Sequence, residues 1–159
     1  VNLVLEKIAS SGRAFHNYRA GQITPDRFQR TSRTADMIDR LVEMQKGSDI
    51  IIHPMQLGLR WRGKSVRRGH ELYIKQEFGE GSLEVGSVVL THPERLVRWE
   101  KLDMDCAGDQ FDPDAVGDFC YAPCFNFNDD KAKFDTNRVG GFDGCYGSVS
   151  GALPECLTS

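Results

Sequence analysis

The sequence lacks the features that most directly reveal where a protein works. It contains no run of about 18 apolar residues, the length that a membrane-spanning helix needs. Its first residues, VNLVLEKIASSG, have neither the basic start nor the long apolar segment of a signal peptide. We therefore expect a cytoplasmic protein without a membrane span. The alternative is a secreted protein whose signal peptide has been removed.

Cysteine is unevenly placed in the chain. All five cysteines lie in the last third of the chain, at Cys106, Cys120, Cys124, Cys145 and Cys156. An odd number confined to one end does not resemble a disulfide scaffold, so we expect reduced thiols, with Cys106 and Cys124 packed as small apolar groups. A zinc site is the alternative, but only Cys120 and Cys124 come near the spacing of a zinc knuckle, and no histidine lies close to them in sequence.

Complete catalytic motifs are missing as well. The sequence has no paired nucleophile and base, no glycine-rich phosphate loop and no full set of metal ligands at a recognised spacing. What remains is ordinary for a folded protein: 159 residues, 40% hydrophobic and 27% charged, with a formal net charge of -3. This composition argues against disorder and against general nucleic-acid binding. We expect a single domain over residues 1–159, because a chain of this length buries roughly 70% of its surface on folding.

Two helices are predicted at the start of the chain. Apolar residues recur at helical spacing in residues 2–20, and again after Thr24. Thr24 precedes a proline and an aspartate, as an N-cap residue does, and Gly47 is a suitable C-terminal stop. Residues 1–47 are therefore expected to form a helical hairpin with one apolar stripe on each helix.

A sheet is predicted over residues 48–136. Alternation of apolar and polar residues indicates half-buried strands at residues 56–62, 71–78, 83–90 and 102–106. Thr91-His92-Pro93-Glu94 has the pattern of a capping box and predicts one short helix. Residues 124–135 predict a hairpin with three phenylalanines on its apolar face.

The last segment, residues 137–159, is rich in glycine and serine and is expected to be a loop or tail. The fold class that follows is α+β, with the N-terminal helical hairpin packed on a mostly antiparallel, curved β-sheet.

The acidic stretch around residues 102–128 is the first candidate site. A two-residue period places Asp103 and Asp105 on one face of a strand, about 7 Å apart. Carboxylates on a flexible loop are the ligands that Ca²⁺ or Mg²⁺ prefers, and the candidate ligands are Asp103, Asp105, Asp109, Asp112 and Asp114. The spacing that starts at Asp103 partly matches a calcium-binding EF-hand loop. It departs from that loop at Ala107 and Phe111, which stand where ligands are expected. The alternative is that these aspartates cap turns and keep a loop soluble.

Two further groups of residues could bind a ligand. The basic turn contains Arg60, Arg62, Lys64, Arg67 and Arg68, which could contact phosphates, but the chain is acidic overall and nucleic acid is not expected. Aromatic residues could line a pocket for a small ligand, and the candidates are Trp61, Tyr73, Trp99 and Tyr121. Ordinary core packing is the alternative for each aromatic residue.

The sequence favours a non-enzymatic binding or interaction protein, acting on a small ligand or a protein partner and compatible with a homodimer. This hypothesis depends mainly on the missing catalytic motifs. The competing hypothesis is a small divalent-metal-dependent hydrolase, in which Asp103 and Asp105 are the catalytic candidates and the following loop supplies further carboxylates.

Overall fold

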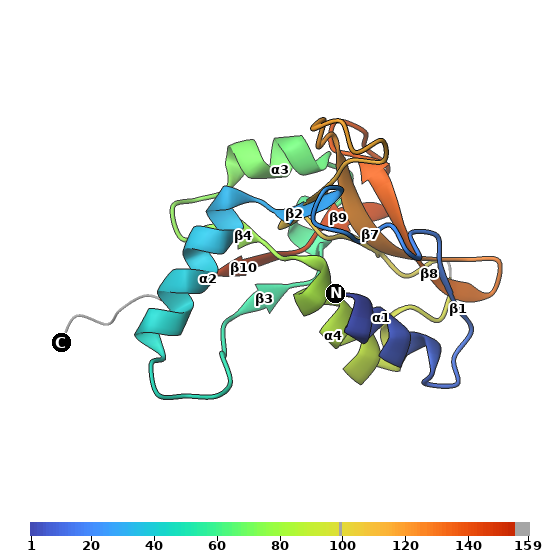
Figure 1. Ribbon diagram of the computed structural model, residues 1–159, viewed down its shortest axis with the longest axis horizontal. Coiled ribbons are helices and arrows are strands. Elements are labelled where there is room, and N and C mark those ends of the chain that lie inside the picture. The colour runs from blue at the N-terminus through green and yellow to red at the C-terminus, as the bar shows by residue number, and fades with distance from the viewer. Residues whose placement is uncertain (99, 155–159) are drawn as a thin grey trace.

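The fold combines helices with two β-sheets in a computed structural model that describes residues 1–98 and 100–154 (Figure 1). The helices are α1 (Asn2–Ala9), α2 (Ser32–Met44), α3 (Val66–Leu72) and α4 (Ser82–Thr91), with short 3₁₀ turns at Leu59–Trp61 and Pro93–Arg95. The strands are β1 (Phe15–Asn17), β2 (Phe28–Arg30), β3 (Met55–Gln56), β4 (Glu77–Gly79), β5 (Asp103–Asp105), β6 (Asp109–Phe111), β7 (Tyr121–Asn128), β8 (Lys131–Arg138), β9 (Tyr146–Ser148) and β10 (Ser150–Ala152). This arrangement confirms the predicted α+β class.

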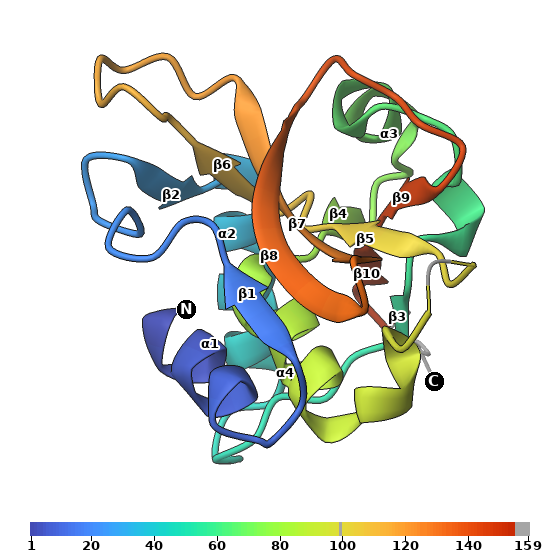
Figure 2. The same ribbon diagram turned by 90° about the vertical axis from the view of Figure 1, so that its right-hand side faces the viewer.

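The large sheet has the strand order β1-β8-β7-β5-β9, and β6 adds to β7 and carries β2 at its other edge. Within the described residues, β1–β8 and β5–β9 are the parallel pairs, and the other neighbours run antiparallel. The long β7–β8 hairpin forms its centre (Figure 2). The small sheet has the order β3-β10-β4 and is antiparallel.

The main core lies between one face of the large sheet and the helices α1 and α4. Met104, Phe125 and Phe134 pair across β5, β7 and β8 and are fully buried there. Ile8 of α1 and Val89 of α4 belong to the same cluster. A second, smaller core joins α2 to the small sheet. The large sheet is therefore apolar on the face that the two helices cover.

The predicted helical hairpin of residues 1–47 is not seen. Helix α1 ends at Ala9, before a Ser-Ser-Gly break in which Gly12 has a φ of +84°. Residues 15–17 and 28–30 are strands that pair with the large sheet. Helix α2 begins at Ser32, because Thr31 rather than Thr24 supplies the capping side chain and accepts a hydrogen bond from the Thr34 amide. Helix α1 packs against α4 instead of α2.

Three of the predicted strands are also wrong. Residues 56–62 form the end of β3 and a 3₁₀ turn, and residues 71–78 form the end of α3 and most of β4. Residues 83–90 lie in helix α4, where Val85 and Val89 are fully buried and Leu83 is 45% exposed. A spacing of four places both valines on the same helical face, whereas the alternating pattern also fits a strand. The predicted helix after residue 91 is only the 3₁₀ turn at Pro93–Arg95.

The structure agrees best with the sequence in the acidic stretch and the hairpin. Asp103 and Asp105 lie on β5, and β7 and β8 form the predicted hairpin. The segment 137–159 was expected to be a loop or tail, but residues 137–154 contain the end of β8, strand β9 of the large sheet and the central strand β10 of the small sheet. Residues 155–159 of this segment lie outside the described residues. None of the helices in the described chain has the length and apolar character needed to cross a membrane.

Candidate functional site

The face of the large sheet that points away from α1 and α4 is polar. Asp105 of β5 pairs with Ser148 of β9 on one side and with Cys124 of β7 on the other. Cys124 in turn pairs with Asp135 of β8. Because residues paired across neighbouring strands present their side chains on the same face, these four residues form a row across the sheet. The polar positions of the strands therefore gather on one surface.

A cleft of about 360 Å³ opens on this polar face. It is lined by the segment leading into α3, by β5, β8 and β9, and by the connection from β8 to β9, which runs beside α3 in Figure 2. The lining residues are Lys64, Val66, Asp105, Asn137, Arg138, Gly141, Phe142, Asp143 and Tyr146. Backbone hydrogen bonds of 2.9 Å, from Gly63 to Tyr146 and from Arg67 to Val139, hold the wall beside α3 in place.

Asp105 is the most unusual residue of the cleft. It is only 4% exposed, and burial raises its pKa to about 7. The side chain of Asn137 acts in the opposite direction, and the nearby carboxyl of Asp103 adds to the increase. No cation is among the groups that shift the pKa of Asp105. Burial of a carboxyl without a cation lowers the stability of a fold, and carboxyls with such raised pKa values gather at functional sites. Asp105 is therefore a candidate for contacting a ligand.

Asp103 lies beside the cleft but is not among its lining residues. Its Oδ1 accepts a 3.0 Å hydrogen bond from the backbone amide of Phe127. Burial raises the pKa of Asp103 to about 7, although this hydrogen bond lowers it. Tyr146, which pairs with Asp103 in the sheet, also has a raised pKa because of burial. Of the two aspartates predicted as catalytic candidates, only Asp105 therefore faces the cleft.

The predicted basic patch divides between two places. Lys64 lines the cleft, Arg62 donates a 2.8 Å hydrogen bond to the Gly144 carbonyl, and the Arg67 guanidinium lies near Gly140. Arg60 and Arg68 instead pair with Glu77 at 3.5 Å and with Glu71 at 2.7 Å. Arg62 and Arg67 of the predicted patch thus contact the β8–β9 connection that borders the cleft.

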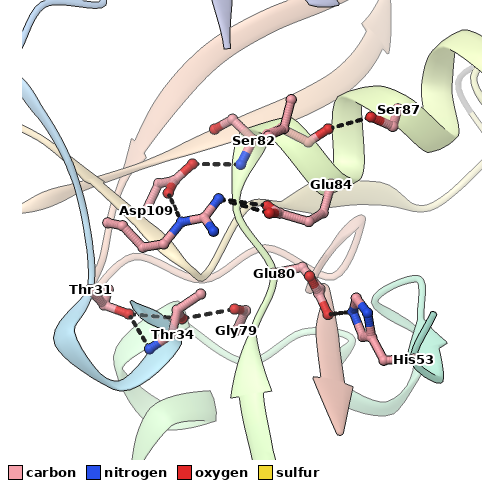
Figure 3. A network of polar contacts seen from close by, with 11 residues as sticks. Thr31, Thr34, His53, Gly79, Glu80, Ser82, Glu84, Ser87 and Asp109 are labelled. Carbon is pink, nitrogen blue, oxygen red and sulfur yellow. Dashed lines mark hydrogen bonds and ion pairs between the residues drawn. The ribbon is translucent and has the colours of Figure 1, made fainter. Parts of the chain in front are cut away.

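The five aspartates predicted as metal ligands do not meet at one point. Asp109 contacts the Ser82 amide and Arg30, and Arg30 also binds Glu84 at 2.8 Å (Figure 3). Asp112 accepts hydrogen bonds from the backbone amides of residues 114, 116, 117 and 118. Asp114 is exposed. In the described parts of the chain, no group of three or more His, Cys, Asp or Glu residues is arranged to hold a metal ion.

The cysteines do not form a site either. Cys106, Cys120, Cys124 and Cys145 are free thiols. Cys106 and Cys124 are fully buried, as expected for small packing groups, and burial raises the pKa of both well above the ordinary value. Cys156 lies outside the described residues.

The aromatic residues expected to line a pocket are dispersed. Trp61 and Tyr73 are buried with ring centroids 5.5 Å apart, and the Trp61 indole donates to Glu77 at 2.9 Å. Tyr121 lies beneath the guanidinium of Arg138, whose central carbon is 5.3 Å from the ring centroid. Trp99 lies outside the described residues. None of the described three lines the cleft on the polar face.

Sequence reasoning missed Asn137, Asp143 and Tyr146 as members of a site. The signal for Asn137 was present in KAKFDTNR, because a strand that turns Ala132 and Phe134 toward a core turns Asp135 and Asn137 the other way. Tyr146 carried no such signal, since its strand was read as a loop. Comparison of the chain with family models, with curated proteins and with solved structures finds no match. Its function therefore has to be inferred from the geometry of the cleft.

Proposed function

We propose that the chain is a binding protein for a small polar ligand, which it holds in the cleft on the polar face of the large sheet. The observation that carries this proposal is Asp105, a carboxyl that is 4% exposed, lines the cleft and has no cation among its neighbours. Because an unpaired buried carboxyl destabilises a fold, its place in an open cleft favours a role in binding.

The size and lining of the cleft support the same proposal. A volume of about 360 Å³ is at the lower end of the range for small-molecule sites, which is about 300–1,000 Å³. Charged and amide side chains outnumber apolar ones among the lining residues, although Val66 and Phe142 contribute apolar surface. Such a lining suits a small molecule with several hydrogen-bonding groups better than an apolar one.

A thiol-based reaction receives no support from the cleft. Cys124, next to Asp105 in the sheet, is fully buried, and burial raises its pKa well above the ordinary value. The exposed Cys145 has a pKa raised by the neighbouring Asp143 carboxylate. Because the thiolate is the reactive form, neither cysteine is prepared to act as a nucleophile.

The experiment is a fragment screen observed in ¹⁵N-HSQC spectra of the wild-type protein, with Mg²⁺ and Ca²⁺ included as separate samples. A ligand of the cleft should shift the amide signals of Asp105, Asn137 and Tyr146, and the same shifts should disappear in Asp105→Asn. The matched control Asp114→Asn changes an exposed aspartate outside the cleft and should bind like the wild type.

Two results would contradict the proposal. Fragments whose shifts map to another surface, with the cleft signals unchanged, would remove the cleft as the binding site. Shifts at Asp103 and Asp105 produced by Mg²⁺ or Ca²⁺, together with hydrolysis of a phosphate ester, would favour the metal-dependent hydrolase instead.

A further inference from the structure

The cleft contains charges of both signs, with a negative group buried on the sheet and a positive group nearer to solvent. Asp105 is buried on the sheet, whereas Lys64 and Arg138 are exposed residues of the lining. Neither cation takes part in an ion pair within residues 1–98 and 100–154. The guanidinium of Arg138, however, lies over the Tyr121 ring on the other face of β7 and β8, outside the cleft. The cleft thus combines a deep carboxyl without a cation with one outer cation, Lys64, without an anion.

The fourth charged residue of the lining, Asp143, differs from Asp105. It is exposed, and its Oδ1 accepts a 2.8 Å hydrogen bond from the backbone amide of Cys145. That bond uses the carboxylate to stabilise the turn at the end of the β8–β9 connection. Asp105 is therefore the carboxyl of the cleft that is left for a ligand.

This arrangement discriminates between classes of ligand. A simple anion would be attracted by Lys64 but would meet the buried Asp105, and burial of like charges together is unfavourable. A simple cation would pair with Asp105 but would be repelled by Lys64. A molecule with a positive group at one end and a negative group at the other can pair with the buried carboxyl and with the outer cation at the same time.

We propose that the ligand is a small amino acid or a related zwitterion, whose ammonium group pairs with Asp105 and whose carboxylate faces Lys64. This inference rests on the proposed binding function of the same cleft. Asn137 offers an amide beside Asp105 that can complete the hydrogen bonds of an ammonium group. Val66 and Phe142 supply apolar surface for the carbon chain between the two charges.

The position of Asp105 gives the binding a definite pH dependence. An ammonium ion binds the ionised carboxylate, so affinity should fall by roughly tenfold per pH unit below about pH 7. The ionisable groups around Asp105 are Asp103 on the same strand, Cys124 on β7, Asp135 on β8, Tyr146 on β9 and Tyr73 after α3. Lys64, Arg138 and Asp143 also line the cleft. Burial also raises the pKa of Asp103 to about 7, so this carboxyl loses its negative charge together with Asp105 and does not reverse the trend.

The test uses probes of matched length that differ in charge. Glycine, 4-aminobutyrate and 6-aminohexanoate are titrated into the ¹⁵N-labelled protein at pH 8, alongside butylamine and butyrate. At least one amino acid should bind at least tenfold more tightly than both butylamine and butyrate. Asp105→Asn and Lys64→Gln should each weaken that binding at least tenfold. Asp114→Asn and Lys46→Gln, which alter exposed charges away from the cleft, should not change it.

Each other outcome would overturn the inference in a recognisable way. Equal binding of butylamine and 4-aminobutyrate would remove the role of Lys64, and tighter binding of butyrate would remove the role of Asp105. Binding that does not change between pH 8 and 5 would contradict the pairing with Asp105 without depending on any variant. If none of the probes binds while a neutral fragment still occupies the cleft, the zwitterion is wrong and the binding function stands. If nothing occupies the cleft, both proposals fail.

Discussion

At the scale of single residues, the buried carboxyls make stability depend on pH in an unusual direction. The pKa of Asp105 is raised from 3.8 to about 7 by burial. The folded state therefore binds this proton more tightly than the unfolded state does. The stabilisation is fully present below pH 3.8 and is lost as the pH rises through about 7.

Replacing Asp105 by asparagine should consequently stabilise the free protein at pH 8 and have little effect at pH 4. A shift from 3.8 to about 7 corresponds to an upper limit of about 4 kcal/mol in the free energy of unfolding at pH 8. Urea unfolding of the wild type and Asp105→Asn at both pH values measures this difference. Asp114→Asn serves as the control, and a loss of stability in Asp105→Asn at pH 8 would contradict the assignment of an unpaired carboxyl.

Glu80 presents a different case, because a histidine compensates its burial (Figure 3). Glu80 is fully buried, and its Oε1 lies 2.7 Å from Nε2 of His53. Its Oε2 has no hydrogen-bond partner in the part of the chain that the structure describes. Burial raises the pKa of Glu80, and the hydrogen bond to Glu80 raises the pKa of His53.

Removing only one partner of this pair should be more harmful than removing both. We expect His53→Ala to lower the free energy of unfolding by about 3 kcal/mol, because it leaves a buried carboxyl alone. The double variant His53→Ala/Glu80→Gln should recover part of that loss, since a neutral amide is less costly to bury. Thermal unfolding of the wild type, both single variants and the double variant gives the coupling energy. Simple additivity of the two changes would argue against a direct interaction.

At the scale of elements, glycine allows the small and large sheets to approach each other. Gly79 is in β4, and a Cβ at this position would lie 2.7 Å from the backbone nitrogen of Gly108, in the turn between β5 and β6. A Cβ at Gly108 would in turn lie 2.5 Å from the Gly79 carbonyl oxygen. Both obstacles are backbone atoms, which cannot move aside as a side chain can.

Gly79→Ala should therefore separate β4 from the β5–β6 turn and destabilise the protein by about 3 kcal/mol. The matched control is Gly144→Ala, because a Cβ at Gly144 meets no atom within 4 Å. Circular dichroism during thermal unfolding compares the two variants. Equal melting temperatures for both would show that the close approach of the two segments does not limit stability.

The elements that the sequence predicted correctly are those with an unambiguous local pattern. The β7–β8 hairpin combines alternating residues with the turn signal Asn128-Asp129-Asp130, and Asp129 and Asp130 adopt the positive φ values of 51° and 58° that such a turn needs. Residues 83–90 lacked this clarity, because the spacing of Leu83, Val85 and Val89 fits a strand, whereas that of Val85 and Val89 also fits one side of a helix. Gly86 weakens the helical signal further, and only the folded structure explains it, because a Cβ there would lie 3.0 Å from the Val4 side chain of α1.

At the scale of the whole molecule, the cleft could not be predicted from sequence because its parts meet only after folding. Lys64 and Asp105 are far apart in the chain, and the wall that carries Tyr146 was expected to be a loop. The two aspartates of β5 were recognised from their spacing, but the spacing does not reveal that one faces the cleft and the other a backbone amide. The parallel pairing of β5 with β9 determines both environments.

The same connections lead us to expect that the molecule unfolds as one unit, as a single domain should. The backbone of β4 and its continuation is tied to the large sheet through hydrogen bonds from Glu80 to Val149 at 3.0 Å and from Gly108 to Glu80 at 2.8 Å. The backbone amide of Val149, between β9 and β10, also donates to the backbone carbonyl of Asp105 at 2.9 Å. These bonds cross between the two sheets, so opening one sheet should expose the other.

Phe125→Ala in the main core and Phe78→Ala in the second core test this cooperativity. Both side chains are fully buried, and each truncation should lower the free energy of unfolding by about 3–5 kcal/mol. In a single cooperative unit, far-ultraviolet circular dichroism and the amide signals of both sheets should report the same midpoint in each variant. If Phe78→Ala melts the small sheet and α2 while the β7–β8 signals persist, the chain contains two separately folding parts, and the small sheet is not needed to maintain the face of the large sheet that carries the cleft.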